Sequence, residues 1–350
     1  MKKGYLIVLI IFVVITLIYF CFSFSNKTEE AQIAIAGDVM LGRNINEAML
    51  NKPAEYFWGD VIGKINEADL FLVNLECVLT DSEEKSEIVK SFYFKASPER
   101  AVKVLEAGGT DVVNLANNHV LDFKEKGMND TLSSLDKAGI KHVGAGSLEE
   151  AGKIERIEVN GIKIGIIGVT DNRNEWKVEG DKQGINYYEI NNESARKLGE
   201  KIREARDNFD LIILTIHWGP NLRTDPSEEF REFAKEMVAS GVDIIHGHSS
   251  HMFQGVEVYK NKIIIYDSGE FLDDYGHNEL KLYQSFLFLI NIKDKKIANL
   301  EMLPVFIDGK VELAAGTEKA EIMDRMINLS AKFGTSLEKQ ETKLLLKLNS

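Results

Sequence analysis

The sequence is poor in cysteine, proline and histidine, and these shortages narrow the class of protein. Of 350 residues, two are cysteine, five are proline and seven are histidine. Cys21 lies in a long apolar run and Cys77 in a core-like segment, so no disulfide framework is expected. We interpret Cys77 as a small buried hydrophobic residue. The chain is 44% hydrophobic and has no proline-rich stretch, so it is long and apolar enough for a large core.

Positive charge is also scarce. Lysine and arginine number 42 against 55 aspartates and glutamates, which gives a formal net charge of −13. No long basic stretch occurs, and the field of such a chain repels polyanions, so no nucleic-acid partner is expected. An anionic ligand would need a local basic or metal-lined patch.

The N-terminal segment predicts a membrane anchor. Residues 5–24 carry no charge and are long enough, as a helix, to cross the hydrocarbon core of a bilayer. No small-residue cleavage site follows, as a signal peptide would require. Lys2 and Lys3 precede the run and orient it with the N-terminus in the cytoplasm. We therefore expect a signal anchor over 1–25 and an extracytoplasmic remainder at the cell membrane.

Beyond this anchor, short apolar runs alternate with helical patterns. Runs typical of strands buried on both faces occupy 32–38, 68–76, 111–119, 162–170, 211–219 and 242–248. Helical patterns occupy 54–65, 98–107, 127–138, 192–208 and 227–240, the last with Asp225 as the expected N-cap. This alternation predicts one mixed α/β domain over 26–334, followed by a charged tail over 335–350.

Polar side chains gather where the predicted strands end. The residues concerned are Asp38, Glu76, Asn118, His119, His217, His248 and His251. Because the carboxyl ends of strands in an open α/β sheet form one rim, we expect these side chains to meet there. Carboxylate, amide and imidazole ligands together suit divalent Mn, Fe or Zn, as one ion or two. His246 either orients a ligand or packs in the core, and the sequence leaves this open.

Five motifs carry a resemblance to a known family. They are AGDVMLGR (36–43), NLE (74–76), LANNHVLDF (115–123), HWG (217–219) and GHSSHMFQG (247–255). In this order they resemble the CapA/PgsA capsule-synthesis family, a divergent branch of the calcineurin-like metallophosphoesterases. The resemblance implies a four-layer αββα sandwich. It also implies a role in the synthesis or export of poly-γ-glutamate.

The resemblance further implies roles for the gathered residues. It makes Asp38, Asn118, His217, His248 and His251 metal ligands, together with Glu76 as the carboxylate that bridges two ions. It makes His119 a catalytic residue that gives a proton to the leaving group or stabilises the transition state. Asp122, three residues further on, is expected to orient that imidazole, or alternatively to cap the following turn.

The chain departs from the metallophosphoesterase pattern at three places. Met40 stands where histidine is typical, the bridging residue is glutamate, and the last motif is lengthened by one residue to Gly-His-x-x-His. A thioether serves a hard or borderline divalent ion poorly. We therefore expect the metal position nearest Asp38 and His251 to be the weaker one, unless Asp267 or Glu270 takes the missing place.

Substrate contacts are predicted at Arg43 and Trp218. Arg43 follows the first motif and would hold a carboxylate or phosphate as a fork, unless it is only a surface charge. Trp218 is expected to form a wall of the cleft. Arg173 and Arg223 share the ambiguity of Arg43, and Asp273 is expected in a solvated loop.

Three functions are compatible with these residues. The first is a membrane-anchored, extracytoplasmic CapA-type protein that acts on poly-γ-glutamate or a related anionic polymer together with membrane subunits of its synthase. The second is a metal-dependent extracellular phosphoesterase. The third is a scaffold component of the synthase that binds the polymer without catalysis.

Overall fold

The computed structural model describes residues 29–276 and 281–348. The predicted anchor over 1–25 and Cys21 lie outside the described residues. Among the residues that are described, no helix has the length and apolar character needed to span a bilayer. Cys77 is a free, buried cysteine, as its sequence context predicts.

The larger of the two main sheets has ten strands. Its members are β1 (Glu30–Val39), β2 (Leu70–Leu75), β5 (Val112–Asn114), β6 (Lys141–Val143), β15 (Glu270–Leu272), β16 (Gln284–Lys293), β17 (Lys296–Ile307), β18 (Val311–Leu313), β19 (Glu338–Lys339) and β20 (Leu344–Lys347). The main path runs β19-β20-β17-β16-β1-β2-β5-β6, with β15 beside β1 and β18 beside β17. Strands β1, β2, β5 and β6 are parallel, whereas β16 runs antiparallel to β1.

The second main sheet has six strands. They are β8 (Glu155–Val159), β9 (Ile162–Thr170), β11 (Leu211–His217), β12 (Ile244–His248), β13 (Val256–Tyr259) and β14 (Lys262–Ile265), in the order β13-β14-β12-β11-β9-β8. The four inner strands are parallel and the two edge strands are antiparallel to their neighbours. Two small ladders join β3 (Val78–Leu79) to β4 (Lys95–Ala96) and β7 (Ala145–Gly146) to β10 (Gly184–Ile185). The predicted mixed α/β class is confirmed.

The helices alternate with the strands along the chain. The α-helices are α2 (Arg43–Ala48), α3 (Ile62–Ile65), α4 (Pro98–Ala107), α5 (Lys124–Ala138), α6 (Leu148–Gly152), α7 (Asn192–Ala205), α8 (Glu228–Ser240) and α9 (Gly316–Ala331). Short 3-10 helices lie at η1 (Ala54–Val61), η2 (Asn174–Trp176) and η3 (Arg206–Asn208). The start predicted for α8 was wrong, because the helix begins at Glu228 after an N-cap at Ser227 and not at Asp225.

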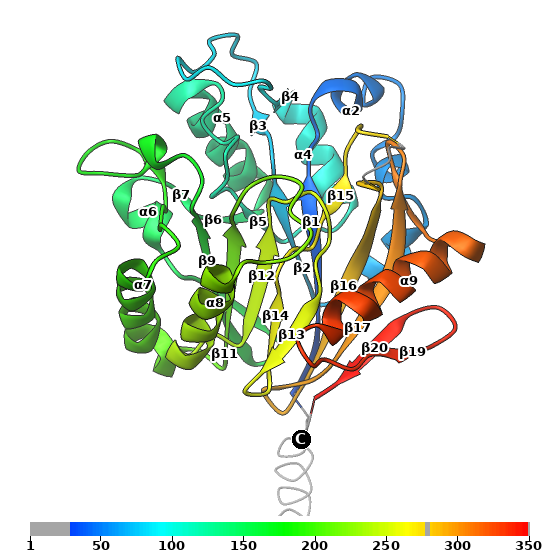
Figure 1. Cartoon of the computed structure of the whole chain (residues 1–350). Helices are drawn as coiled ribbons and strands as arrows, with labels where there is room; N and C mark the ends of the chain where they lie inside the picture. The colour runs from blue at the N-terminus through cyan, green and yellow to red at the C-terminus, as the bar shows by residue number, and fades with distance from the viewer. Residues whose placement is uncertain (1–28, 277–280, 349–350) are drawn as a thin grey trace, which may run out of the picture.

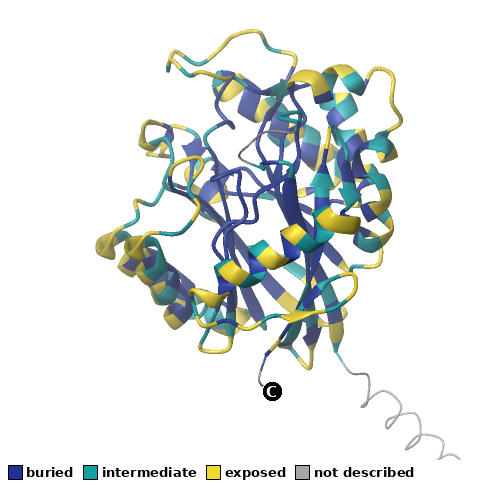
Figure 2. Ribbon diagram, turned by 45° about the vertical axis from the view of Figure 1, so that its right-hand side comes forward, coloured by how far each residue is buried: buried dark blue, intermediate teal, exposed yellow. Residues whose placement is uncertain are grey.

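The inner strands of both main sheets, such as β2, β11 and β12, are buried on both faces, which explains their continuous apolar runs. Along β1, Ile33 and Ile35 pack in a core that also contains strand residues of the smaller sheet. The alternate residues Ala34 and Ala36 pack in a core shared with α4 and α5. A third core joins α7 and α8 to the outer face of the smaller sheet. Figure 1 shows this arrangement, and Figure 2 shows the buried strands between helices whose outer faces are exposed.

The C-terminal segment belongs to the sheet. Residues predicted as a charged tail include β20, which pairs antiparallel with β17. Leu344 and Leu346 are buried in the core between the sheets, together with Met323 and Met326 of α9. The segment after residue 334 therefore contributes to the packed domain.

The strand ends that carry the polar motifs meet at the junction of the two sheets. Asp38 ends β1 of the larger sheet, whereas His217 and His248 end β11 and β12 of the smaller one. The expectation of a rim formed by one sheet was wrong, since two sheets share it. Gly37 permits the approach of the next segment, because a Cβ there would lie 1.8 Å from the carbonyl oxygen of Gly269. The result is a parallel pairing that sets Asp38 opposite Glu270.

Candidate metal centre

Asp38 is shared by two groups of side chains that could each hold a cation. The first group is Asp38, His217 and His248, and the second is Asp38, Glu76, His251 and Glu270, with all side chains buried. In each group the ligand atoms lie within 4.8 Å of one another. Asp38 is the member common to both groups, whereas Glu76, which the resemblance makes the bridging carboxylate, belongs to the second group.

The first group is dominated by imidazoles. Nδ1 of His217 and Nδ1 of His248 lie 2.9 Å apart. They lie 4.0 Å and 3.9 Å, respectively, from Oδ1 of Asp38. Burial lowers the pKa of His217 to about 3 and the pKa of His248 well below its ordinary value. Both rings are therefore neutral at pH 7, which is the form that binds metals.

The second group is dominated by carboxylates. Nδ1 of His251 lies 3.4 Å from Oδ2 of Asp38, 3.8 Å from Oε2 of Glu76 and 2.5 Å from Oε1 of Glu270. Burial raises the pKa of Glu76 and of Glu270 well above the ordinary carboxyl value, and nearby Asp38 adds to this effect. Burial opposes a charge on His251, yet Glu270 and Glu76 raise its pKa well above the usual value. Such a concentration of buried acid favours a cation.

Unpaired polar atoms test whether the centre suits a metal ion. Buried atoms without a hydrogen-bond partner include Asp38 Oδ2, Glu76 Oε1, Asn118 Oδ1 and Glu270 Oε2, whereas His251 Nδ1 and Glu270 Oε1 lie 2.5 Å apart. Nearly all buried polar atoms in proteins are paired, so this accumulation requires an explanation. Oxygen and nitrogen atoms without protein partners that point into one buried space are what metal coordination uses. The residues fit a divalent cation.

Neighbouring side chains hold the ligands in place. The amide of Asn74 donates to Asp38 Oδ1 at 2.7 Å and accepts from the amide of Asn114 at 2.9 Å. Thr215 Oγ1 lies 3.0 Å from Nε2 of His248 and 3.1 Å from Nδ1 of His246. His246 thus supports the ligand His248 through Thr215 and contributes no ligand atom to either group, which answers the question that the sequence left open.

His119 lies at the edge of the centre with its imidazole held on one side. Its Nδ1 lies 2.6 Å from Oδ2 of Asp122, and its Nε2 lies 3.7 Å from Oε1 of Glu76. The ring stacks on Phe94 with centroids 4.3 Å apart, and Asp122 also accepts from the Phe94 amide at 2.8 Å. Burial lowers the pKa of His119 to about 4 although Asp122 acts to raise it. The contact expected between Asp122 and His119 is therefore present.

Lys90 is a member of this arrangement that the sequence did not reveal. Its side chain is 4% exposed, and its ammonium lies 2.5 Å from Oδ1 of Asp122 and 3.1 Å from Nδ1 of His119. It also donates to the backbone carbonyl of Asn118. A lysine in a loop with no flanking motif gives no sequence signal, because only the tertiary fold brings it to Asp122.

Trp218 has a different position from the one expected, whereas Met40 is not placed as a ligand, as the sequence predicts. Trp218 is fully buried, its indole donates to the carbonyl of Tyr266 at 2.9 Å, and it stacks on the Tyr266 ring. It belongs to the core behind the centre and not to a substrate-facing wall. The sulfur of Met40 accepts from the amide of Gly42 at 3.1 Å, and the residue packs in the core beside α4 and α5. Met40 is thus no ligand of either group.

The segment after Asp267 is more buried than expected. Asp273 is 2% exposed, and burial raises its pKa to about 7, so the expectation of a solvated loop was wrong. Arg43 pairs with Asp274 at 3.4 Å and lies between the rings of Phe92 and Tyr275. The Tyr275 ring lies 6.0 Å from that of His251, so Arg43 stands at the margin of the centre.

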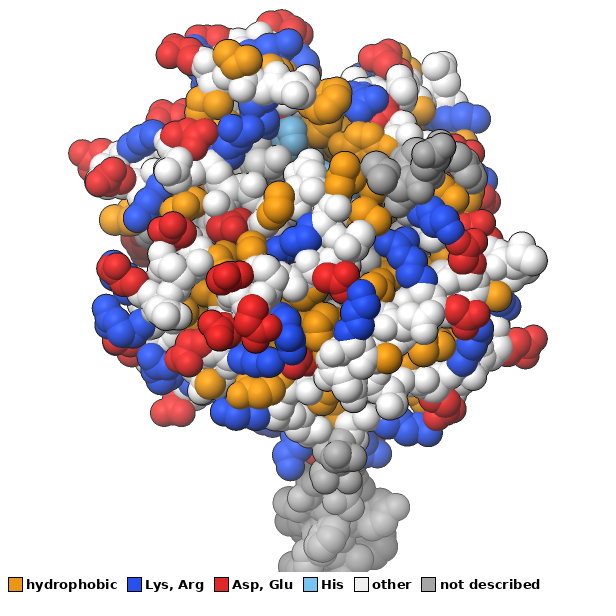
Figure 3. Space-filling model, in the orientation of Figure 1, with side chains coloured by type: hydrophobic (Ala, Val, Ile, Leu, Met, Phe, Trp, Pro, Cys, Tyr) orange, Lys and Arg blue, Asp and Glu red, His pale blue; other side chains and the backbone are white. Residues whose placement is uncertain are grey.

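A cleft of about 510 Å³ opens beside His119. Its lining includes Lys90, Phe92, Asn118, Arg173 and Asn221. The amide of Asn221 lies 3.0 Å from Nε2 of His251, which joins the cleft to the second group. Figure 3 shows a histidine at the base of a hollow in the upper part of the molecule. The cleft gives solvent access to the edge of the centre.

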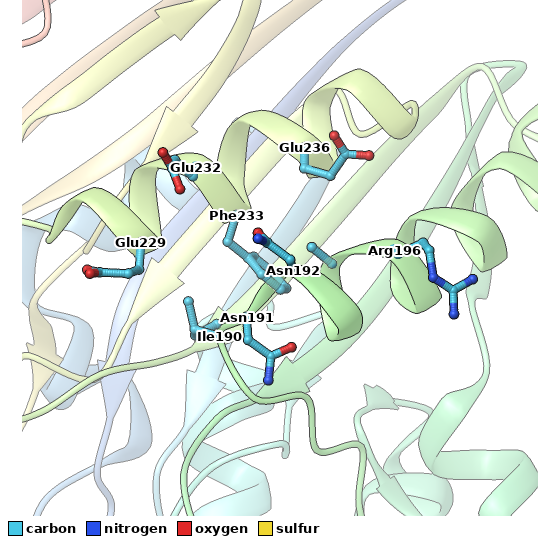
Figure 4. A pocket seen from close by; sticks show the side chains of 9 residues that line it. Ile190, Asn191, Asn192, Arg196, Glu229, Glu232, Phe233 and Glu236 are labelled. Carbon is cyan, nitrogen blue, oxygen red and sulfur yellow. The ribbon is translucent and has the colours of Figure 1, made fainter.

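A second cavity lies away from the centre, between α7 and α8. It measures about 600 Å³ and is lined by Glu229, Glu232, Glu236 and Phe233 of α8 with residues of the α7 segment (Figure 4). None of its lining residues belongs to the metal groups or contacts His119. Its size alone does not make it the functional site, since it lacks the convergent ligand atoms of the strand ends.

The fold and the site together define a mixed α/β protein with a buried carboxylate–imidazole centre of the kind that binds divalent metals. The chain belongs to the bacterial capsule synthesis protein family PGA_cap, whose pattern matches residues 32–275. That range contains Asp38, Glu76, His217, His248, His251 and Glu270, so the whole centre falls within it.

Curated relatives agree with this membership. The chain is 30% identical over 329 residues to a capsule biosynthesis protein CapA of Bacillus anthracis, with 93% of this chain and 79% of that protein covered. It is 29% identical over 318 residues to the PGA biosynthesis protein CapA of Bacillus subtilis, covering 87% and 82%. A probable polyglutamine synthesis accessory protein of Mycobacterium tuberculosis is 26% identical over 375 residues, covering 92% and 97%. Among solved structures, a hypothetical protein of Thermus thermophilus aligns with a TM-score of 0.49 at 14% identity, covering 78% and 98%.

Proposed function

We propose that this protein is a membrane-anchored, extracytoplasmic accessory protein of capsule synthesis that acts on poly-γ-glutamate or a related anionic polymer. One observation carries the proposal: the family's matched range contains two buried groups of side chains that could hold a metal ion, with unpaired oxygen atoms, beside an open cleft. The names of the relatives supply the pathway, and the centre supplies the chemistry. A protein that only held the polymer would not need a buried centre of this kind.

The fold supports a metallophosphoesterase-like ancestry. Two sheets pack face to face, α4 and α5 cover one outer face, and α7 and α8 cover the other. This order supports the four-layer αββα sandwich that the resemblance implies. The ligands come from strand ends of both sheets, which is where such a sandwich brings loops together.

The residues of the centre have separable tasks. Asp38, His217 and His248 would hold one ion, and Asp38, Glu76, His251 and Glu270 a second. A divalent ion held there supplies a Lewis acid that polarises a substrate oxygen and lowers the pKa of water. Asn118, whose Oδ1 is buried and unpaired, is proposed as a further ligand.

His119 is proposed as the residue that transfers a proton. Asp122 holds Nδ1, and Nε2 on the opposite side of the ring points toward Glu76 and is therefore the atom that exchanges a proton with a bound group. The neutral ring would accept a proton at Nε2 from the attacking water and give it to the leaving group. Lys90 fixes Asp122 and so fixes the ring.

The cleft is suited to an anionic chain although the protein as a whole is acidic. Lys90 and Arg173 line it, and Arg43 stands close by at the margin of the centre. Each of these three side chains is paired with a carboxylate, and Asp171 and Glu175 also line the cleft. The positive charge that an anionic polymer requires on a protein with a net charge of −13 would therefore come mainly from bound metal. Arg43 and Arg173 are proposed as carboxylate contacts.

The course of β1 supports an arrangement in which the centre faces away from the membrane. Asp38 stands eight residues along β1 from Glu30, roughly 26 Å at about 3.3 Å per residue. Glu30 therefore lies at the end of β1 away from the centre, and an anchor formed by residues 1–25 would join the domain at that end. Protease added to intact protoplasts should digest the domain, and complete protection would contradict this location.

Complementation tests the function. The gene is expressed in a Bacillus subtilis strain that lacks its own CapA relative, and extracellular poly-γ-glutamate is measured. We expect polymer to be restored by the unchanged chain and not by Asp38→Asn, which removes the shared carboxylate. Restoration by both would favour the non-catalytic scaffold. Turnover of p-nitrophenyl phosphate with added Mn²⁺, without complementation, would favour an extracellular phosphoesterase.

A further inference from the structure

The two metal groups differ in the chemistry of their ligand atoms. The first offers two imidazole nitrogens and one carboxylate, whereas the second offers three carboxylates and one imidazole. Imidazole suits Zn²⁺ and its neighbours in the transition series, whereas carboxylate suits Mn²⁺ and Mg²⁺. Two positions that share Asp38 are thus built from different donor sets within one buried space.

Glu270 adds the third carboxylate to the second group, beside those of Asp38 and Glu76. Its side chain is fully buried, Oε2 lacks a hydrogen-bond partner, and Oε1 lies 2.5 Å from Nδ1 of His251. Pairing of β15 with β1 sets Glu270 opposite Asp38. Gly269, with φ 74°, precedes it in a backbone conformation that glycine adopts without strain. The side chain is therefore held by the sheet and not by a flexible loop.

We propose that the centre holds two different divalent ions, with Glu270 as the ligand that distinguishes them. A nitrogen-preferring ion such as Zn²⁺ binds between Asp38, His217 and His248. An oxygen-preferring ion such as Mn²⁺ binds among Asp38, Glu76, Glu270 and His251. The inference depends on the metal centre of the proposed function and not on its substrate or pathway.

The charge of the centre gives this difference a consequence. Three carboxylates against one divalent ion leave a net negative charge, which repels an anionic chain. Three carboxylates against two divalent ions leave one positive charge, which attracts it. Binding of an anionic substrate then requires the ion that Glu270 helps to hold.

A competition experiment on the full-length chain tests the inference. The purified protein is stripped with a chelator and given Zn²⁺ and Mn²⁺ together, free ions are removed, and bound metal is measured by mass spectrometry. We expect one Zn and one Mn per chain. Two Zn ions, or two Mn ions, under equal supply of both would overturn the proposal.

Two variants should separate the positions. Glu270→Gln keeps the size of the side chain and should weaken Mn²⁺ binding at least about tenfold, while Zn²⁺ remains bound. A loss of that size is already seen when a residue that hydrogen-bonds a metal ligand is replaced. His217→Ala should lose Zn²⁺ and keep Mn²⁺. If each variant loses both ions to the same extent, the groups form a single undivided site and the proposal is wrong.

Matched controls separate ligand loss from misfolding. Glu257→Gln makes the same change at a buried glutamate that bonds Tyr266 and lies outside both groups. Met40→Leu removes a sulfur that contacts Gly42. Both controls should retain one ion of each kind. Pulsed electron spin resonance of the unchanged protein tests the assignment without a variant. Bound Mn²⁺ should couple to the nitrogen of one imidazole. Coupling to two imidazole nitrogens would place Mn²⁺ with His217 and His248 and contradict the proposal.

Discussion

Replacing Lys90 with methionine should destabilise the protein strongly, because it leaves the carboxylate of Asp122 buried without a counter-charge. Asp122 is fully buried, and the Lys90 side chain is 4% exposed. Methionine has nearly the length of lysine and fills the same space, so the change removes charge and not volume. Burial lowers the pKa of Lys90 although Asp122 acts to raise it, so the buried ammonium carries a desolvation penalty that its pairing with Asp122 offsets in part.

The size of the effect follows from the partners that Asp122 retains. Removing one member of a buried ion pair typically costs about 3–5 kcal/mol. Two donors remain on Asp122 after the change, the Phe94 amide at 2.8 Å and Nδ1 of His119 at 2.6 Å. We therefore expect the lower end of this range, about 3 kcal/mol. Natural domains have a free energy of unfolding of about 5–15 kcal/mol, so the loss should be plain.

Urea unfolding of the metal-free protein measures this loss as a shift of the midpoint at constant slope. Lys95→Met is the matched control: Lys95 pairs with Glu83 at 2.5 Å in the same part of the chain, but the Glu83 side chain is 87% exposed. The control should change the free energy of unfolding little, because water replaces the lost partner. If Lys90→Met costs no more than Lys95→Met, Asp122 does not need the ammonium and the reasoning is refuted.

Three further outcomes are expected. His119→Ala should keep bound metal but reduce polymer formation by about 10²–10⁴-fold, whereas His217→Ala should lose Zn²⁺ and polymer together; loss of metal from His119→Ala would make it a ligand. The pKa values of Glu76 and Glu270 are raised, mainly by burial, so both hold protons at a higher pH than usual. Because Mn²⁺ must displace these protons, its affinity should rise with pH. Calorimetry in buffers of different ionisation heat should detect the released protons. Binding heats that do not depend on the buffer would disprove the release. Trp218→Phe should support normal polymer formation, because the indole lies in the core; a selective loss of polymer with unchanged stability would return Trp218 to the cleft.

Most of the secondary structure could be predicted because the apolar runs are long and nearly continuous. The expected strand at 162–170 and helix at 98–107 coincide with β9 and α4. The start of α8 was misplaced, because Asp225 and Pro226 form a start signal that the chain does not use before Glu228. The strand near the C-terminus was missed because β20 takes its partner from β17, far back in the sequence, and local charge hid the buried leucines.

The sequence predicted the candidate ligands that lie in motifs at strand ends. It could not firmly predict the residues that reach the centre only because distant segments pair in the fold. Asp38, His217 and His248 follow apolar runs and could be found from that position alone. Glu270 belongs to none of these motifs and was named only as an alternative to Asp267 for the missing place, since it reaches Asp38 through the pairing of β15 with β1. Lys90 likewise depends on how the loop after β3 folds back. Trp218 was misjudged because its neighbour His217 is a candidate metal ligand, whereas the Trp218 side chain packs in the core with α8.

The arrangement of the strands accounts for the strain found beside the centre. Residues of two sheets must bring their ligand atoms to one point, and the strand ends alone supply only part of the set. The chain after β12 therefore turns back at once, with φ 112° at Ser249 and φ 63° at His251, values that side-chain-bearing residues seldom adopt. Asp267 helps to fix this turn by accepting from the Ser250 amide at 2.8 Å. Backbone strain of this kind persists where surrounding contacts enforce it, and here it aims the imidazole of His251 at Asp38 and Glu270.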